Sequence, residues 1–267
     1  MLLPGTYANG FAPRDGSPLY PELWRGCVGA WNPGLGVSGL TLRDNSGFNR
    51  HGKLTSGPTW AATKGKYALS FDGTDDYVDV GNLGTFPDKG AILFWMNPAV
   101  IANYNNPFQT DSGNAGIRFE ETASGQFYIV IAYAGSPDVH YYLSSGLTAN
   151  KWIHVSLVWD KPANIVKGHL DGVQKFSESQ TNWPSSLPIV RIGTGLTSSR
   201  FWNGFMDDVL IYNRALSPQE IRTLATRRGI AYEMAPRRRS SVQVTVAPLR
   251  YNLFSGSIGN TDVIGAS

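Results

Sequence analysis

Short apolar runs, separated by turn residues, recur along most of the chain. Ala91–Met96 (AILFWM), Gln126–Tyr133 (QFYIVIAY) and Trp152–Trp159 (WIHVSLVW) are almost continuously apolar. Runs of this length and composition are typical of strands that are covered on both faces. The sequence therefore predicts strands buried in the middle of a sheet at these three places.

Other segments alternate apolar and polar residues around turn signals. Lys66–Val80 does so on both sides of Asp72-Gly73, and Lys167–Phe176 carries Asp171-Gly172 between two such runs. An Asp-Gly pair in this setting is a strong hairpin signal. Ile189–Ile192 and Phe205–Tyr212 complete the set. The pattern predicts an all-β fold, a two-sheet antiparallel β-sandwich.

One helix is expected, near the C-terminal end of this pattern. Ser217 suits the N-cap, Pro218 the first helical position and Glu220 the third, which together make a capping box. Arginines and a glycine predict that this helix ends near Arg227–Gly229.

The length of 267 residues fits one large all-β domain with extensions. Residues 1–22 are rich in Pro, Gly and Asp and are interpreted as an extended N-terminal arm. The folded domain is placed at residues 23–228. Residues 229–267 are interpreted as an Arg-rich extended arm, in which alternating valines at 242–246 favour a strand.

Composition removes several classes of site. Cys27 is the only cysteine, so neither a disulfide framework nor a cysteine-based zinc site can form. The N-terminus lacks the basic and apolar segments of a secretory signal, and no apolar run approaches membrane-spanning length. Synthesis in a host cytoplasm without export or a membrane partner is expected.

Five stretches resemble, in order, the signatures of laminin-G-like domains of the concanavalin A-like lectin/glucanase jelly-roll family. They are Asp44–Gly52 (DNSGFNRHG), Ala68–Val80 (ALSFDGTDDYVDV), Trp152–Val155 (WIHV), Leu170–Gly172 (LDG) and Asn203–Ser217 (NGFMDDVLIYNRALS). The resemblance covers about residues 24–228 and implies a concanavalin A-like jelly roll. The family hosts lectins, enzymes and virion proteins, so the resemblance does not fix the function.

Hydrolysis by the mechanism of related glucanases requires two carboxylates on one face, about 5–5.5 Å apart in retaining enzymes. Glu120 and Glu121 are adjacent in a predicted strand and would point to opposite faces. No G-x-S-x-G sequence occurs, and His154 lies in a strand where burial is the default. We therefore expect a protein that is not an enzyme.

Two kinds of ligand remain. The resemblance implies that Asp44 and Asp207 could hold one structural Ca²⁺; the alternative is that they bond to nearby backbone groups. For sugars, aromatic and amide side chains in predicted loops are candidates. They are Tyr104, Asn105, Asn106, Tyr141, Trp183 and Trp202.

The net charge of +3 is small, but arginines gather near the C-terminus. We interpret them as a site for an acidic protein partner rather than for nucleic acid, because aromatic residues for base stacking are sparse there. The arginines are Arg227, Arg228, Arg237, Arg238 and Arg239.

The flanks (LWRGCVGAW before the domain and the arginine-rich tail) resemble laminin-G-like proteins of tailed bacteriophages. The first hypothesis is therefore a non-enzymatic virion subunit, a capsid decoration, cement or fibre protein that contacts capsid proteins and forms a homo-oligomer, with a trimer as the guess. The alternative is a lectin-like module that binds cell-surface glycans.

Overall fold

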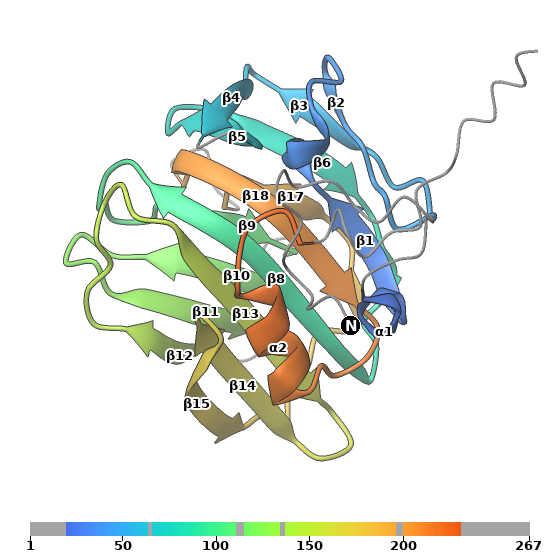
Figure 1. Ribbon diagram of the computed structural model, residues 1–267. Coiled ribbons are helices and arrows are strands. Elements are labelled where there is room, and N and C mark those ends of the chain that lie inside the picture. Colours follow the sequence, from blue (N-terminus) through green and yellow to red (C-terminus); the bar gives the residue numbers. More distant parts are fainter. Residues whose placement is uncertain (1–19, 64–65, 111–114, 134–136, 196–199, 231–267) are drawn as a thin grey trace, which may run out of the picture. The chain divides into compact units, whose positions relative to one another are not determined.

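The computed structural model describes residues 20–63, 66–110, 115–133, 137–195 and 200–230. Most of the expected N-terminal arm, the predicted strand at 242–246 and the arginines at 237–239 lie outside the described residues. Figure 1 shows the arrangement of the elements.

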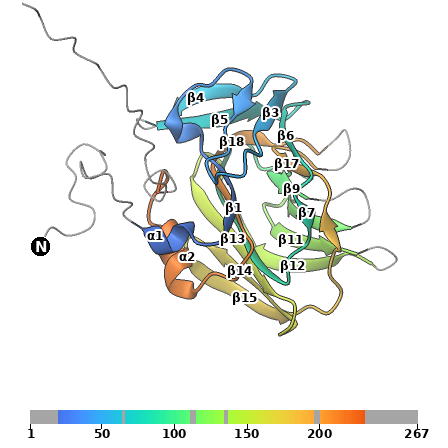
Figure 2. The same ribbon diagram turned by 90° about the vertical axis from the view of Figure 1, so that its right-hand side faces the viewer.

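Two eight-stranded antiparallel sheets pack face to face, which confirms the predicted all-β sandwich (Figures 1 and 2). Sheet A has the order β15-β14-β13-β8-β18-β5-β4, with β1 also paired to β18. Its strands are β1 (Cys27–Trp31), β4 (Thr59–Thr63), β5 (Lys66–Asp72), β8 (Lys89–Pro98), β13 (Ile153–Asp160), β14 (Ile165–Leu170), β15 (Val173–Ser179) and β18 (Asn203–Tyr212).

Sheet B has the order β12-β11-β10-β9-β17-β6-β3-β2. Its strands are β2 (Thr41–Leu42), β3 (Gly52–Thr55), β6 (Tyr77–Gly81), β9 (Phe108–Gln109), β10 (Gly116–Glu121), β11 (Phe127–Ala132), β12 (Val139–Ser144) and β17 (Val190–Ile192). A separate small sheet pairs β7 (Gly84–Thr85) with β16 (Ser186–Leu187).

The main core lies between the two sheets, because alternate side chains of each point inward. Phe94 of sheet A meets two rings of sheet B, with centroids 5.9 Å from Phe108 and 4.8 Å from Phe119. All three are completely buried. The predicted hairpin is also confirmed, since Asp171 (φ 50°) and Gly172 (φ 77°) form the turn between β14 and β15.

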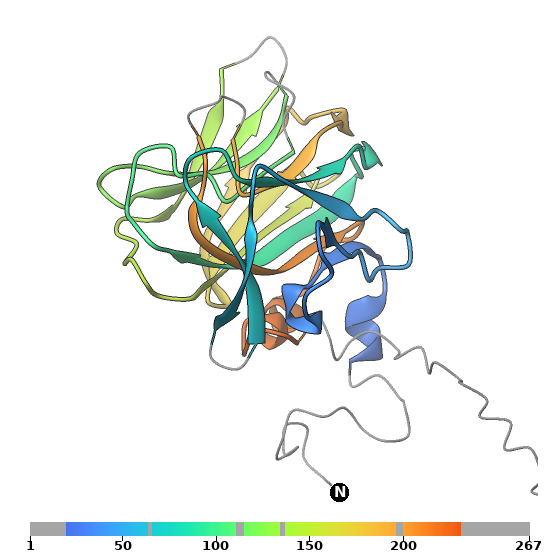
Figure 3. The same cartoon turned by 90° about the horizontal axis from the view of Figure 1, so that it is seen from above.

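The outer face of sheet A, the face turned away from this core, is covered by helices. A second apolar cluster joins Leu93 and Leu210 of the sheet to Leu23 of helix α1 (Pro21–Trp24) and to Ile221 and Leu224 of helix α2 (Pro218–Leu224). Figures 2 and 3 show α1 and α2 side by side on this face. The central strand β8 is thus buried on both faces, as its unbroken apolar sequence predicts.

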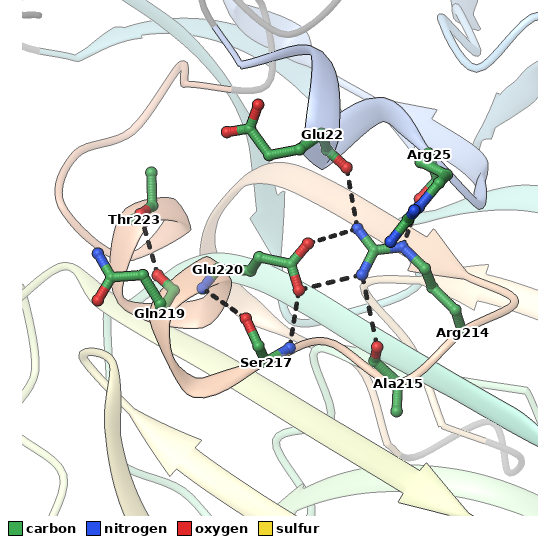
Figure 4. A network of polar contacts seen from close by, with 8 residues as sticks. All are labelled: Glu22, Arg25, Arg214, Ala215, Ser217, Gln219, Glu220 and Thr223. Carbon is green, nitrogen blue, oxygen red and sulfur yellow. Dashed lines mark hydrogen bonds and ion pairs between the residues drawn. The ribbon is translucent and has the colours of Figure 1, made fainter.

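One arginine joins the two helices (Figure 4). Arg214 forms a two-pronged contact with Glu220 (2.7 and 3.0 Å) and donates to the carbonyl oxygens of Glu22 (3.0 Å) and Arg25 (2.6 Å). Glu220 also completes the predicted capping box with Ser217.

Some helical details differ from the predictions. Helix α2 ends at Leu224, earlier than predicted, and the chain beyond it reaches β18, where the amide of Gly229 donates to Asp208. Helix α1 was not predicted, and a single 3-10 turn forms at Pro33–Leu35. Among the described residues, no helix is long and apolar enough to cross a membrane.

Candidate functional site

The outer face of sheet B is crossed by one row of mostly polar residues. Gln109 and Arg118 alternate along their strands with the core residues Phe108 and Phe119, so they point away from the core. Positions paired directly across seven strands extend the row. It comprises Lys53, Asp79, Arg191, Gln109, Arg118, Val130 and His140.

An aromatic cluster (Tyr128, His140 and Tyr142) lies at one end of this face. The ring centroid of Tyr128 is 5.2 Å from that of Tyr142 and 5.7 Å from that of His140, both edge to face. The hydroxyl of Tyr128 donates to Gln126 Oε1 (2.8 Å), which fixes the central ring. Tyr142 is 43% exposed and His140 is exposed, so two oriented rings are open to a ligand.

A charged network (Arg118, Glu120, Asp138 and Arg200) borders the aromatic cluster. Arg118 pairs with Asp138 and lies 3.7 Å from Glu120, whose Oε2 also accepts from Arg200 (2.8 Å). The Arg200 guanidinium in turn lies 4.2 Å above the ring of Tyr104. Glu120 stands directly opposite the central ring of the aromatic cluster in the β10–β11 register. The rings therefore border a charged network whose inner members, Arg118 and Glu120, are buried.

The predicted sugar-contact residues are placed very differently from one another. Tyr104 is 41% exposed and belongs to the surface just described. Trp202 is fully buried in the core, and Tyr141 points inward, so neither ring offers a face to a ligand and the prediction is corrected for both. Trp183 is half-buried and packs against the core. Asn105 is buried and has a structural role.

Asn105 holds a buried carboxylate. Its amide nitrogen donates to Glu121 Oε2 (2.7 Å), and its oxygen accepts from the backbone of Asn203 (2.7 Å). Burial raises the pKa of Glu121 to about 7, although the hydrogen bond from Asn105 acts in the opposite direction. Glu121 thus faces inward and Glu120 outward, as predicted, and the two carboxylates cannot flank one glycosidic bond.

Hydrogen bonds from surrounding backbone and side-chain groups occupy the carboxylate of Asp44. Its Oδ1 accepts from the amides of Ala30 (3.0 Å) and Ser46 (2.9 Å), and its Oδ2 from the Ser46 hydroxyl (2.8 Å) and the Arg50 amide (3.0 Å). A carboxylate has about four acceptor positions. All are filled, so Asp44 does not fit the calcium hypothesis and fits the alternative, a turn-forming carboxylate.

Asp207 faces an arginine of its own chain. It is fully buried, and its Oδ2 lies 3.6 Å from Arg228 Nε. Burial, and then the neighbouring Asp208, raise the pKa of Asp207 well above its usual value, while burial raises that of Asp208 to about 6. Arg228 therefore neutralises this pair of carboxyls in part, and a calcium role for Asp207 stays a prediction.

The structure brings together a different acidic group, which the sequence analysis did not combine. Asp72, Asp75 and Asp76 each offer a carboxylate oxygen within 4.8 Å of the others. These are oxygen ligands of the kind that Ca²⁺ prefers. However, Asp72 accepts from Thr74 N (2.7 Å) and Asp76 from Asp72 N (3.1 Å), so turn formation accounts for two of the three.

Arg228, a predicted partner-binding residue, instead contacts its own chain. It donates to Thr63 Oγ1 (2.8 Å) and Thr63 O (2.9 Å), and its guanidinium lies 3.9 Å above the Trp152 ring. The prediction is corrected for this residue, whereas Arg227 is exposed. The amide of Gly229 donates to Asp208 and Ile230 is buried, so the folded part continues past the predicted boundary.

The residues and geometry above agree with comparisons to known proteins. Residues 72–222 match the family model described as the concanavalin A-like lectin/glucanases superfamily, and the chain belongs to this family. Its laminin-G-like, lectin-like jelly roll was the fold that the sequence motifs implied.

Solved structures give the same fold. Domain 4 of AbnA, a GH43 extracellular arabinanase from Geobacillus stearothermophilus in complex with arabinotriose, has a TM-score of 0.63 and 17% identity over 74% of this chain and 98% of that one. The binding domain of Paraclostridial Mosquitocidal Protein 1 has a TM-score of 0.60 and 17% identity, over 76% of this chain and 52% of that one.

The botulinum neurotoxin serotype D ligand binding domain, in complex with N-acetylneuraminic acid, has a TM-score of 0.57 and 14% identity, over 75% of this chain and 50% of that one. The chain spans about half the length of the two toxin domains. At these identities the likeness shows the fold alone.

Sequence reasoning missed most of the sheet B surface. Its members come from strands that are distant in sequence, and only the pairing register brings them together. A local signal was available: in a strand ending at Leu143, the period of two places His140 and Tyr142 on the face opposite to Leu143.

Proposed function

We propose that the protein is a carbohydrate-binding module that takes a glycan along the outer face of sheet B. The observation that carries the proposal is the juxtaposition of exposed, oriented rings with the charged network on that face. A sugar presents an apolar ring face and a rim of hydroxyl groups, so it suits a surface that offers both aromatic and hydrogen-bonding groups.

Preorganisation of this surface supports the proposal. The hydrogen bond to Gln126 and the edge-to-face contacts hold Tyr128, so little side-chain freedom remains to be lost when a ligand binds. Arg200 is held in the same way between Glu120 and the Tyr104 ring. Adjacent strands are about 4.8 Å apart, so the paired positions from β10 to β12 span about 10 Å, which is room for a short oligosaccharide.

The comparisons support the proposal without extending it. The structure of the arabinanase domain contains arabinotriose, and that of the neurotoxin domain contains N-acetylneuraminic acid. Proteins that share this fold therefore hold sugars, and two of the three are named as binding domains. Binding of a glycan by this chain rests on its own surface residues.

The test is a glycan array with the full chain, followed by titration calorimetry of the strongest hit against Tyr142→Ala. We expect this variant to lose at least about tenfold in affinity, or 1.4 kcal/mol, since an exposed ring is removed. Tyr67→Ala is the matched control, because Tyr67 is 38% exposed but belongs to sheet A. An array without hits, or equal losses in both variants, would refute the proposal.

A place on a virion, with capsid partners and trimeric assembly, stays a prediction. Of the arginines that motivated an acidic protein partner, Arg228 contacts its own chain and three lie outside the described residues. Co-purification with phage particles and a trimeric mass in solution would support it. A monomer that binds glycans and leaves particles alone would favour the lectin-like module by itself.

A further inference from the structure

The middle of the sheet B face contains a buried amide without hydrogen bonds. The side chain of Gln109 points outward from β9 yet is fully buried, and within the described part of the chain neither its oxygen nor its nitrogen has a hydrogen-bond partner. Leaving both ends of a buried amide unpaired costs free energy that an apolar side chain of similar shape would avoid. Such a group in a folded protein calls for an explanation, and a ligand is one.

An arginine beside it is also short of partners. Arg191 stands directly opposite Gln109, one strand away, and its Nε is buried without a hydrogen bond. Its guanidinium lies 4.9 Å from the Tyr77 ring, and across the described ranges no carboxylate approaches it within 4.0 Å. Asp79, opposite Arg191 on its other side, directs Oδ1 to the amide of Gly81 instead (3.0 Å).

A second amide repeats the observation close by. Asn106 is fully buried, and both of its side-chain polar atoms lack a partner among the described residues. A Cβ placed on Gly195 would lie 2.5 Å from Asn106 Nδ2 and 2.7 Å from Arg200 Cβ, so Asn106 lies close to the charged network. Asn106 and Gln109 belong to the same short segment. Gln109 thus lies between Arg191 and Arg118 in the strand register, and Asn106 lies near Arg200.

We infer that Arg191, backed by these buried amides, recognises a carboxylate on a sugar ring, so that the ligand is an acidic glycan. This rests on the proposed function, because Arg191 and Gln109 belong to the same sheet face. Arg191 is partly exposed, and its guanidinium supplies donors of the kind that a carboxylate accepts. The buried amide of Gln109 lies directly opposite it in the strand register. A cation would be repelled by Arg191 and Arg200, and a neutral sugar would leave Arg191 without a carboxylate.

The binding test compares ligands that differ only in the carboxylate. The full chain is titrated with an oligogalacturonide and with its carboxyl-reduced form, and in parallel with sialyllactose and lactose. We expect the acidic member of at least one pair to bind at least about tenfold more tightly, and Arg191→Gln to abolish that preference. The two pairs distinguish a uronate from a sialate as the source of the carboxylate.

Each other outcome decides against the inference. Equal binding of acidic and neutral members overturns it and leaves the proposed function standing, as does binding of neutral array glycans only. Absence of any glycan binding overturns both. Equal affinity for a sulfated oligogalactose would show a general anion site and overturn the assignment to a carboxylate.

A stability measurement separates recognition from a structural role. Gln109→Leu removes the unpaired amide, so we expect an unchanged or higher melting temperature together with loss of the preference for the acidic sugar. Gln180→Leu is the matched control. Gln180 is also buried, but it accepts from the Tyr141 hydroxyl and donates to the carbonyl of Asn182. The melting temperature of this variant should therefore fall. A similar fall in both variants, with the acid preference retained by Gln109→Leu, would overturn the inference.

Discussion

Replacing Arg228 with alanine is expected to destabilise the protein strongly. The side chain of Arg228 is 10% exposed, and it contacts Thr63, Asp207 and Trp152 at once. Asp207 is fully buried, and Arg228 is the cation paired with it. The substitution would remove two hydrogen bonds from a charged donor and leave the carboxyl of Asp207 without its partner.

The expected loss is about 3–5 kcal/mol, the range measured when one member of a buried ion pair is removed. The low end applies if Asp207 takes up a proton, which its raised pKa favours. A typical domain has only about 5–15 kcal/mol of stability in total. The variant would therefore unfold at a clearly lower urea concentration.

Urea unfolding at pH 7, followed by tryptophan fluorescence, measures this loss. Arg222→Ala is the control, because Arg222 is an exposed arginine on helix α2, and its loss should change stability by no more than about 0.5 kcal/mol. The double variant Asp207→Asn/Arg228→Met should recover part of the loss by removing both charges. If Arg228→Ala unfolds within about 1 kcal/mol of the wild type, Arg228 is not a structural residue and its predicted role in partner binding returns.

Two further predictions concern buried carboxyls. The raised pKa of Glu121 means that the folded state binds its proton more tightly than the unfolded state does. Protonated Glu121 therefore favours folding below about pH 4.5, and this contribution is lost as pH rises through about 7. Glu121→Gln should reduce the fall in unfolding free energy between pH 5 and 8 by about 1–3 kcal/mol, and an unchanged pH dependence would contradict this. Asp44→Ala should lower the unfolding free energy by about 2–4 kcal/mol, because four donors lose their acceptor. EDTA should leave the wild-type melting temperature unchanged. A rise in melting temperature with calcium that Asp44→Ala abolishes would restore the calcium hypothesis.

The sequence predicts the elements of this fold well where local physics decides them. The Asp171-Gly172 hairpin and the Ser217–Glu220 capping box follow from backbone conformation and short-range hydrogen bonds. The continuous apolar sequence of β8 reflects burial on both faces. Each of these signals lies within a few residues, so no knowledge of distant contacts is needed to find it.

The candidate site could not be predicted in the same way, because it depends on long-range register. β9 is only two residues long and shows no periodicity, yet it places Gln109 between Arg191 and Arg118. Trp202 was predicted to contact a ligand because it lies in a loop just before β18, where exposure is expected. Its indole is instead buried in the core. Local pattern does not reveal which side of a strand end is covered.

The two helices on sheet A show on which face of the sandwich the described chain ends lie. Residues 20–24 and 225–230 both lie against that sheet, on the side opposite the outer face of sheet B. The described ends of the folded part are therefore on the side away from the proposed glycan surface. If sheet B takes a glycan as proposed, a partner held near these ends would not compete with the glycan for the same face.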